Sequence, residues 1–255
     1  MTETRVDPLD RAPVDLAGAV ERELGVPEGL VVAVGAGPGL LRRWRAAGAR
    51  VVSVGAAGAD HVDVVAGVSA LPVRDGAAAA VVVLHRLHEV ADVDAAFAGI
   101  ARVLAPGGRV VLSANALGDR RELRGLWATA ARDCGVVPPP PFLAADESFP
   151  LDHAQAWLAR HFETVEVTPL RGTSVLDLAE VLAFVRAQRP AEAGVTWDLL
   201  ASVVERKVRE VVAAEGGFAV STLVGIGSAT RAATAEVPAP AKRPARSWAR
   251  AGRSR

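Results

Sequence analysis

Two groups of residues in this chain have types and spacings that suit chemistry on a small ligand. The first is a glycine run, Gly35-Ala36-Gly37-Pro38-Gly39, which stands between a β-branched segment and a helical pattern. Glycines let a backbone turn tightly and approach a ligand closely, and free amides at a helix start attract anionic groups. A plain tight turn is the alternative. As a dinucleotide fingerprint the run fails, because Leu40 stands where the third glycine is expected.

The second group is a pair of histidines, His85 and His88, which follow the strand-like segment 79–84. Imidazole titrates near neutral pH, so each histidine is a candidate catalytic base at the carboxyl end of a strand. Packing at the start of the next helix is the alternative for His88. Asn115 similarly suits either contact with an acceptor molecule or capping of the next helix.

No residue pattern in the sequence predicts a metal site. His153 and His161 stand too far apart to form a paired metal face on one helix, and no H-E-x-x-H motif occurs. Cys134 is the single cysteine, which excludes an internal disulfide and favours a small core residue at a helix end.

Buried strands alternate with amphipathic helices in the first half of the chain. Short valine-rich runs predict strands covered on both faces, and apolar stripes at helical spacing predict the helices between them. The expected strands are 30–34, 50–54, 62–66, 79–84 and 109–113, and the expected helices are 13–24, 40–47, 92–104 and 120–134. This rhythm is typical of an α/β protein with a doubly wound parallel sheet, which binds ligands beyond the carboxyl ends of its strands.

The second half of the chain predicts a less regular arrangement. Segment 136–150 contains four consecutive prolines and suits either a lid over a ligand or a stiff surface loop. Helices are expected at 153–161, 174–186 and 196–214, and strands at 163–168 and 218–226, the last of them antiparallel. Residues 1–234 are therefore expected to form one domain, with 136–214 as its lid and helical insert.

Composition narrows the class of protein. The 255 residues are 51% hydrophobic with zero formal net charge, which suffices for a sizeable core. No apolar run is long enough to span a membrane and the N-terminus is polar, so we expect a cytoplasmic protein. Residues 235–255 carry six basic residues against one acid and are expected to be a disordered tail. This tail suits nucleic acid, an acidic partner or no partner, and no nucleic-acid binding is expected of the rest.

Four segments occur in an order and at a spacing that resemble a known family. They are the glycine run, Leu71-Pro72-Val73-Arg74-Asp75-Gly76, Leu87-His88-Glu89-Val90, and the stretch from Ile100 to Leu112 that contains Pro106-Gly107-Gly108. Together they resemble the class I S-adenosylmethionine-dependent methyltransferases, in the branch with a type 11 methyltransferase domain. The resemblance is best over 30–115, the cofactor-binding half. It implies a Rossmann-like seven-stranded sheet with an antiparallel last strand and a helical insert between strands six and seven.

The resemblance also implies a cofactor, S-adenosylmethionine, and a small molecule that accepts its methyl group. By position, the glycine run would hold the methionine part, and residues after the second, third and fourth strands would flank the ribose, the adenine and the sulfonium. The implied cofactor-binding residues are Gly35, Ala36, Gly37, Gly39, Gly55, Ala56, Val68, Ser69, Leu84 and His85. His88 matches the first histidine of a frequent His-His pair in that branch and is, with His85, the candidate catalytic residue.

The acids that family members usually carry around the cofactor are absent. Ala33, Gly55, Val68 and Ala80 stand in their places. Losing the carboxylate that binds the ribose hydroxyls weakens binding by roughly tenfold to a hundredfold, unless water or Asp60 substitutes for it. Two functions stay open: a small-molecule methyltransferase, or a methyltransferase-like binding or scaffold protein with weak or no cofactor binding. A nicotinamide-dependent oxidoreductase is disfavoured by Leu40 and the same missing acid.

Overall fold

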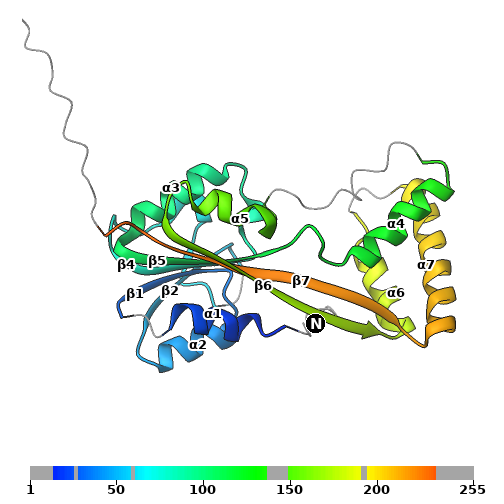
Figure 1. The fold of residues 1–255 in the computed structure, drawn as a ribbon, viewed down its shortest axis with the longest axis horizontal. Coiled ribbons are helices and arrows are strands. Elements are labelled where there is room, and N and C mark those ends of the chain that lie inside the picture. The colour runs from blue at the N-terminus through cyan, green and yellow to red at the C-terminus, as the bar shows by residue number, and fades with distance from the viewer. Residues whose placement is uncertain (1–13, 26–27, 59–60, 137–148, 191–193, 234–255) are drawn as a thin grey trace, which may run out of the picture.

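The centre of the molecule is a seven-stranded sheet. The structure, a computed structural model, describes residues 14–25, 28–58, 61–136, 149–190 and 194–233. Its strands lie in the order β3-β2-β1-β4-β5-β7-β6 (Figure 1). Strands β1 to β5 pair in parallel, whereas β7 runs antiparallel to both β5 and β6. The predicted fold class is confirmed, including the antiparallel last strand.

The parallel strands form where the sequence is richest in valine and alanine. They are β1 Leu30–Val34, β2 Arg50–Gly55, β3 Val64–Val65, β4 Ala78–Leu84 and β5 Leu104–Asn115. Apolar side chains on both faces of β1 and β4 are buried, as expected for central strands with helices above and below. The carboxyl ends of β1, β4 and β5 therefore meet at one edge of a rigid sheet.

Helices cover both faces of the parallel part of the sheet. Helices α1 (Leu16–Leu24) and α2 (Pro38–Ala46) lie on one face, and α3 (Val93–Val103) and α5 (Leu151–Leu158) lie on the other (Figure 1). Leu41 and Trp44 fill the core under α1 and α2, whereas Phe97 and Ile100 fill the core under α3. Pro38 starts α2, a position where its fixed φ suits the helix and its missing N–H costs nothing.

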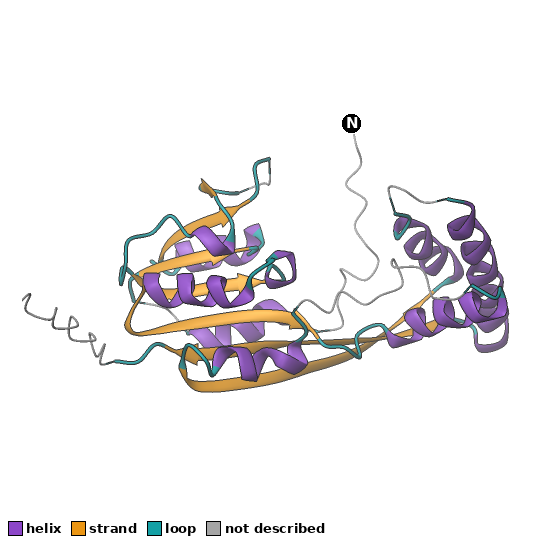
Figure 2. Ribbon diagram, turned by 90° about the horizontal axis from the view of Figure 1, so that it is seen from above, coloured by secondary structure: helices purple, strands orange, loops and turns teal. Residues whose placement is uncertain are grey.

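The last two strands leave the sheet as a long ribbon. Strands β6 (Glu163–Leu176) and β7 (Phe218–Thr230) remain paired as far as Leu176 and Phe218, whereas β5 stops pairing with β7 at Asn115. The far end of the ribbon carries a helical lobe of α4 (Arg121–Asp133), α6 (Leu178–Ala187) and α7 (Val195–Glu215) (Figure 2). This lobe has its own core, centred on Trp127, Trp197 and Leu200. The predicted helical insert between strands six and seven is thus confirmed.

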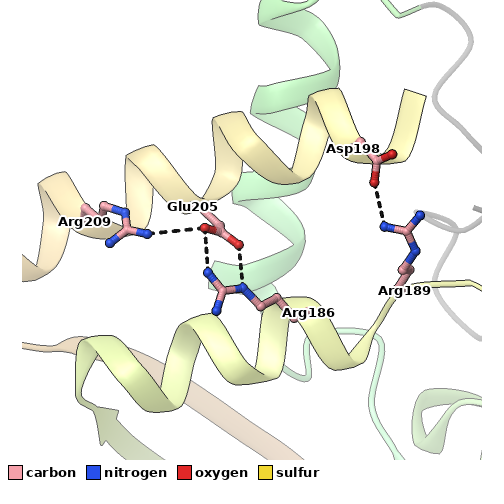
Figure 3. Close-up of polar contacts among 5 residues, drawn as sticks. All are labelled: Arg186, Arg189, Asp198, Glu205 and Arg209. Carbon is pink, nitrogen blue, oxygen red and sulfur yellow. Dashed lines mark hydrogen bonds and ion pairs between the residues drawn. The ribbon is translucent and has the colours of Figure 1, made fainter. Parts of the chain in front are cut away.

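Ion pairs join α6 to α7 on the exposed side of the helical lobe (Figure 3). Arg186 donates two hydrogen bonds to Glu205, at 2.8 and 3.0 Å, and Arg209 lies 3.4 Å from the same carboxylate. Arg189 pairs with Asp198 at 2.6 Å. The hydrogen bonds from Arg186 lower the pKa of Glu205, since they favour its charged form.

The helix predicted at 174–186 begins later than expected. Residues 174–176 belong to β6, where Val175 is 70% exposed and Leu176 is 3% exposed, the alternation of a strand. The helix starts after Asp177, whose side chain accepts from the Glu180 amide while the Glu180 carboxylate accepts from the Asp177 amide. The prediction was wrong because the spacing of Val175 and Leu178 also fits one helical face.

Other boundaries differ less. The strand predicted at 62–66 is limited to Val64–Val65. The prolines at 138–141, Asp60 and the tail 235–255 lie outside the described residues. Within the described parts of the chain, no helix combines the length and the apolar content needed to cross a lipid bilayer.

Candidate functional site

Two cavities lie at the carboxyl ends of the parallel strands. The first, which we call the glycine-loop cavity, has a volume of about 680 Å³. Its wall consists of residues 34–38, 53–56, 62, 65–69, 86 and 89–91. Seven of the ten residues implied for cofactor binding lie on it: Gly35, Ala36, Gly37, Gly55, Ala56, Val68 and Ser69. The remaining three, Gly39, Leu84 and His85, do not line this cavity.

Gly35 turns the chain at the end of β1. Its φ of +75° lies in the left-handed region, and an added Cβ would stand 2.3 Å from the carbonyl oxygen of Leu84. Any larger residue there would have to displace β4 as well as adopt a strained backbone. Gly37 is different, because a Cβ at that position would meet no atom within 4 Å. The loop therefore presents bare backbone to open space at Gly37 and packs tightly at Gly35.

The end of β2 carries Gly55 at a position where the family resemblance led us to expect an acid. A Cβ added to Gly55 would lie 2.8 Å from Cγ2 of Val62, so the space beside this glycine is already filled. The nearby Asp63 is engaged elsewhere: its carboxylate accepts from the Ser53 amide at 2.8 Å and pairs with Arg45 at 2.6 Å. The absence of an acid at position 55 is visible in the sequence, whereas only the structure shows that Val62 fills the space beside Gly55.

Two opposite charges stand on the wall of the glycine-loop cavity. Arg86 and Glu89 are the charged side chains among its described lining residues, and Arg86 donates a hydrogen bond to Glu89. The Cγ atom of Arg86 would be 2.8 Å from a Cβ on Gly35, so the arginine stem lies directly against the glycine loop. The sequence analysis assigned neither residue a role, although Glu89 lies within the histidine motif and Arg86 directly precedes it.

The second cavity, which we call the polar cavity, has a volume of about 510 Å³. It lies between the ends of β4 and β5, the ribbon strand β7 and the start of α1. Its lining residues are Val14, Leu16, His85, Leu87, His88, Ser113, Ala114, Asn115, Asp119, Arg120, Phe149, Thr222 and Val224. Both candidate catalytic histidines and Asn115 therefore share one cavity.

His85 is held in an unusual conformation at the end of β4. Its φ is +48°, and its backbone N–H donates to the carbonyl oxygen and to Oγ of Ser113, each at 3.2 Å. Burial lowers the pKa of the His85 imidazole, and the positive charges of His88, Arg120 and Arg86 lower it further. The ring is therefore neutral at pH 7, with one nitrogen able to accept a proton.

Asp119 and Arg120 enter the polar cavity from the segment after β5. Asp119 is 8% exposed, and its Oδ1 accepts from the backbone N–H of Leu223 at 2.7 Å. Burial raises the pKa of this carboxyl against the effect of that hydrogen bond and of the nearby arginines. Sequence reasoning missed both residues, since their position depends on pairing with a strand about a hundred residues further on.

One short segment separates the two cavities. Residues 85, 87 and 88 face the polar cavity, whereas residues 86, 89, 90 and 91 face the glycine-loop cavity. The 3₁₀ turn Leu87–Glu89 lies within this segment, and its residues Leu87 and His88 line one cavity while Glu89 lines the other. A reaction between a ligand in one cavity and a ligand in the other would need the two to meet at the edge of this segment, because reacting atoms must be in contact.

The remaining candidates lie away from the two cavities. His161 hydrogen-bonds to Asp94 at 3.0 Å and stacks on Phe97, and Cys134 packs against the core of the helical lobe. Within the described ranges, no three His, Cys, Asp or Glu side chains gather in a group that could hold a metal ion.

Comparison with known proteins points to one class. Three solved structures share the fold. A protein from Bacillus halodurans C-125, described as a methyltransferase, is 13% identical with a TM-score of 0.57, and the match covers 86% of this chain and 100% of that chain. A protein from Anabaena variabilis ATCC 29413, described as a methyltransferase from an antibiotic biosynthesis pathway, is 18% identical with a TM-score of 0.55 and coverages of 82% and 95%, and the YcgJ protein from Bacillus subtilis is 15% identical with a TM-score of 0.55 and coverages of 85% and 97%. No curated protein sequence matches the chain.

The fold is thus that of the class I methyltransferases. Residues 31–112 match the family model for a methyltransferase domain, the segment that the sequence motifs had indicated. The resemblance to class I S-adenosylmethionine-dependent methyltransferases is confirmed.

Proposed function

We propose that this protein transfers a methyl group from S-adenosylmethionine to a small molecule. The observation that carries the proposal is the pair of cavities on either side of residues 85–91, in a chain whose glycine-loop half matches a methyltransferase domain. S-adenosylmethionine, when bound, supplies an electrophilic methyl group on a sulfonium. The protein's own contribution is to align an acceptor with that methyl group in a site shielded from water.

The glycine-loop cavity offers the cofactor bare backbone and, at one end, two opposite charges. The bare backbone around Gly37 can approach the methionine part, and Gly55, Ala56, Val68 and Ser69 can flank the nucleoside. Arg86 and Glu89 carry opposite charges beside the glycine loop. The amino-acid part of the cofactor is a zwitterion, so these two side chains can bind its carboxylate and its ammonium group in place of some of the missing contacts.

The polar cavity then receives the acceptor, with His85 as its base. A neutral imidazole accepts the proton that an acceptor O–H or N–H releases as the new bond to carbon forms. Ser113 holds the His85 backbone, so the ring position is fixed by β5. Leu16, Leu87 and Phe149 supply apolar wall. His88 lines the same cavity and is the second candidate for this role.

The alternative is a methyltransferase-like protein that binds a partner without catalysis. The position of Val62 beside Gly55 favours it, because no carboxylate grips the ribose from β2. Calorimetric titration of the full chain with S-adenosylmethionine and S-adenosylhomocysteine decides between the two. We expect micromolar binding of at least one of them. No heat up to millimolar ligand in a folded sample would overturn the enzyme proposal.

A second titration tests the role of Arg86. The variant Arg86→Gln should weaken S-adenosylhomocysteine by roughly tenfold and leave 5′-methylthioadenosine, which lacks the amino-acid part, nearly unchanged. The exposed Arg74→Gln, outside both cavities, is the matched control and should change neither affinity. Equal weakening of both ligands by Arg86→Gln would contradict the proposed contact with the carboxylate.

A further inference from the structure

Arg120 lines the polar cavity with hydrogen-bond donors that the described residues leave without an acceptor. A guanidinium carries five N–H groups. The neighbouring carboxylate oxygen, Oδ2 of Asp119, lies 3.6 Å from Nε, which is beyond hydrogen-bond distance. The Arg120 side chain is 34% exposed, and its nitrogens still reach solvent. Donors at a cavity wall that no protein group satisfies are available to a ligand.

The surroundings of Arg120 fix its orientation and leave one edge open. Its Cζ stands 5.2 Å from the centroid of the Phe184 ring, so the aromatic side chain covers one face of the guanidinium plane. Stacking of this kind leaves the in-plane donors available. Because Asp119 approaches the Nε side, the forked Nη1 and Nη2 edge is the one left for a ligand.

The backbone holds Arg120 at this position at a cost. Its φ and ψ of +51° and +34° lie in the left-handed region, which a non-glycine residue rarely adopts. The Arg120 N–H donates to the carbonyl oxygen of Ser221 at 2.9 Å, which ties the residue to β7. Strain of this kind persists where the surrounding structure enforces it and is concentrated at ligand sites.

Among the described residues that line the polar cavity, Arg120 is the one with a permanent positive charge. His85 is neutral at pH 7, and the buried Asp119 already accepts a hydrogen bond from Leu223. Leu16, Leu87, Phe149 and Val224 supply an apolar part of the wall, beside polar groups such as Ser113 and Thr222. The cavity therefore combines one cationic fork with a surface that suits a hydrocarbon or an aromatic ring.

We propose that the acceptor in the polar cavity is a small molecule with an apolar body and one oxyanion group, a carboxylate or a phosphate, bound by Arg120. This inference rests on the proposed function and names the substrate class of that site. Two oxygens of an oxyanion match the two parallel donors of a guanidinium edge. The oxyanion then fixes one end of the acceptor, and His85 faces the end that receives the methyl group.

Matched probes test the charge preference on the full chain. Benzoate and benzamide have the same shape and differ in charge, and phenyl phosphate presents the alternative oxyanion. Calorimetry, with and without saturating S-adenosylhomocysteine, should show one of the anions binding about tenfold or more tighter than benzamide. The tighter anion identifies the oxyanion. Arg120→Gln should abolish the preference, and Arg121→Gln, the exposed neighbouring arginine, should retain it.

Chemical modification of the unaltered protein gives a second measurement that needs no variant. Phenylglyoxal reacts with accessible arginines, and the tighter anion should slow its reaction with Arg120 but not with Arg121, as mapped by mass spectrometry. Equal affinity for benzoate, phenyl phosphate and benzamide, or equal protection of both arginines, overturns the inference. Anion preference without S-adenosylhomocysteine binding contradicts the proposed function but not the oxyanion site, and the converse result contradicts the oxyanion site alone.

Discussion

The two cavities differ in the material of their walls. The glycine-loop cavity is made mostly of backbone and small side chains, from turns that each follow a parallel strand. The polar cavity is made mostly of side chains, contributed by β5, β7, the start of α1 and the segments after β4, before α4 and before α5. A site made of backbone depends on short contiguous sequence motifs, whereas a site made of side chains depends on segments that are far apart in the sequence. A backbone site is therefore shared by many proteins with the same fold, whereas the residues of a side-chain site differ from one protein to another.

The largest effect should come from the polar cavity, in the variant His85→Asn. Asparagine tolerates the positive φ of this position, so the backbone is preserved while the base is lost. We expect methyl transfer to fall by about 10²- to 10⁴-fold, measured with labelled S-adenosylmethionine and an identified acceptor. Cofactor affinity should stay within a factor of about three. The companion variant His88→Asn should lose less, and a reversed order would exchange the roles of the two histidines.

The next effect concerns the glycine-loop cavity and contrasts two of its glycines. Gly35→Ala places a methyl group 2.3 Å from the Leu84 oxygen at a φ of +75°, so it should destabilise the fold by about 1–3 kcal/mol or more. Gly37→Ala meets no atom within 4 Å and should unfold like the parent. Chemical denaturation measures both. Equal stabilities of the two variants would contradict the close packing of Gly35 against β4.

A smaller effect, a gain in cofactor affinity, is expected when an acid is introduced at Gly55 and space is made for it. Gly55→Asp alone meets Val62, so it should bind S-adenosylhomocysteine no better than the parent. Gly55→Asp combined with Val62→Ala opens that space and should tighten binding by about tenfold, as measured by calorimetry. The same pair with asparagine in place of aspartate controls for shape. If the aspartate pair gains nothing over the asparagine pair, the ribose does not lie beside β2.

The smallest effect lies outside both cavities, in the ion pair of Arg186 and Glu205. Because the pKa of Glu205 is lowered in the folded protein, its contribution to stability is present above the ordinary value of 4.5 and is lost as pH falls below it. Glu205→Gln should therefore lower the melting temperature slightly at pH 7 and not at pH 3. Cofactor binding should be unchanged. A melting difference that persists at pH 3 would assign the effect to packing.

The fold could be predicted from the sequence because its elements carry local signals. The valine runs of β1 and β4 and the glycine run between β1 and α2 fix the sheet and its ligand edge. The start of α6 was missed even though Asp177 and Glu180 have the spacing of a capping box. The apolar periodicity predicted that Val175 belongs to a helix, whereas in the structure Val175 pairs with β7 and belongs to a strand.

Only the part of the candidate site that has local sequence signals could be predicted. The motifs identified most of the glycine-loop cavity and both histidines, because these follow strands directly. Nothing near Asp119 and Arg120 indicates a ligand, since the Leu223 amide and the Phe184 ring that position them come from β7 and α6. A side chain's role in such a cavity depends on contacts that sequence spacing does not encode.

The most direct test of this account is a crystal structure of the protein with S-adenosylhomocysteine. We expect the ligand in the glycine-loop cavity, with its amino-acid part beside Arg86 and Glu89 and its sulfur facing residues 85–91. The polar cavity should remain open beside His85 and Arg120. Ligand bound in the polar cavity, or a glycine-loop cavity that stays empty at saturating ligand, would contradict the division of the site into a cofactor half and an acceptor half.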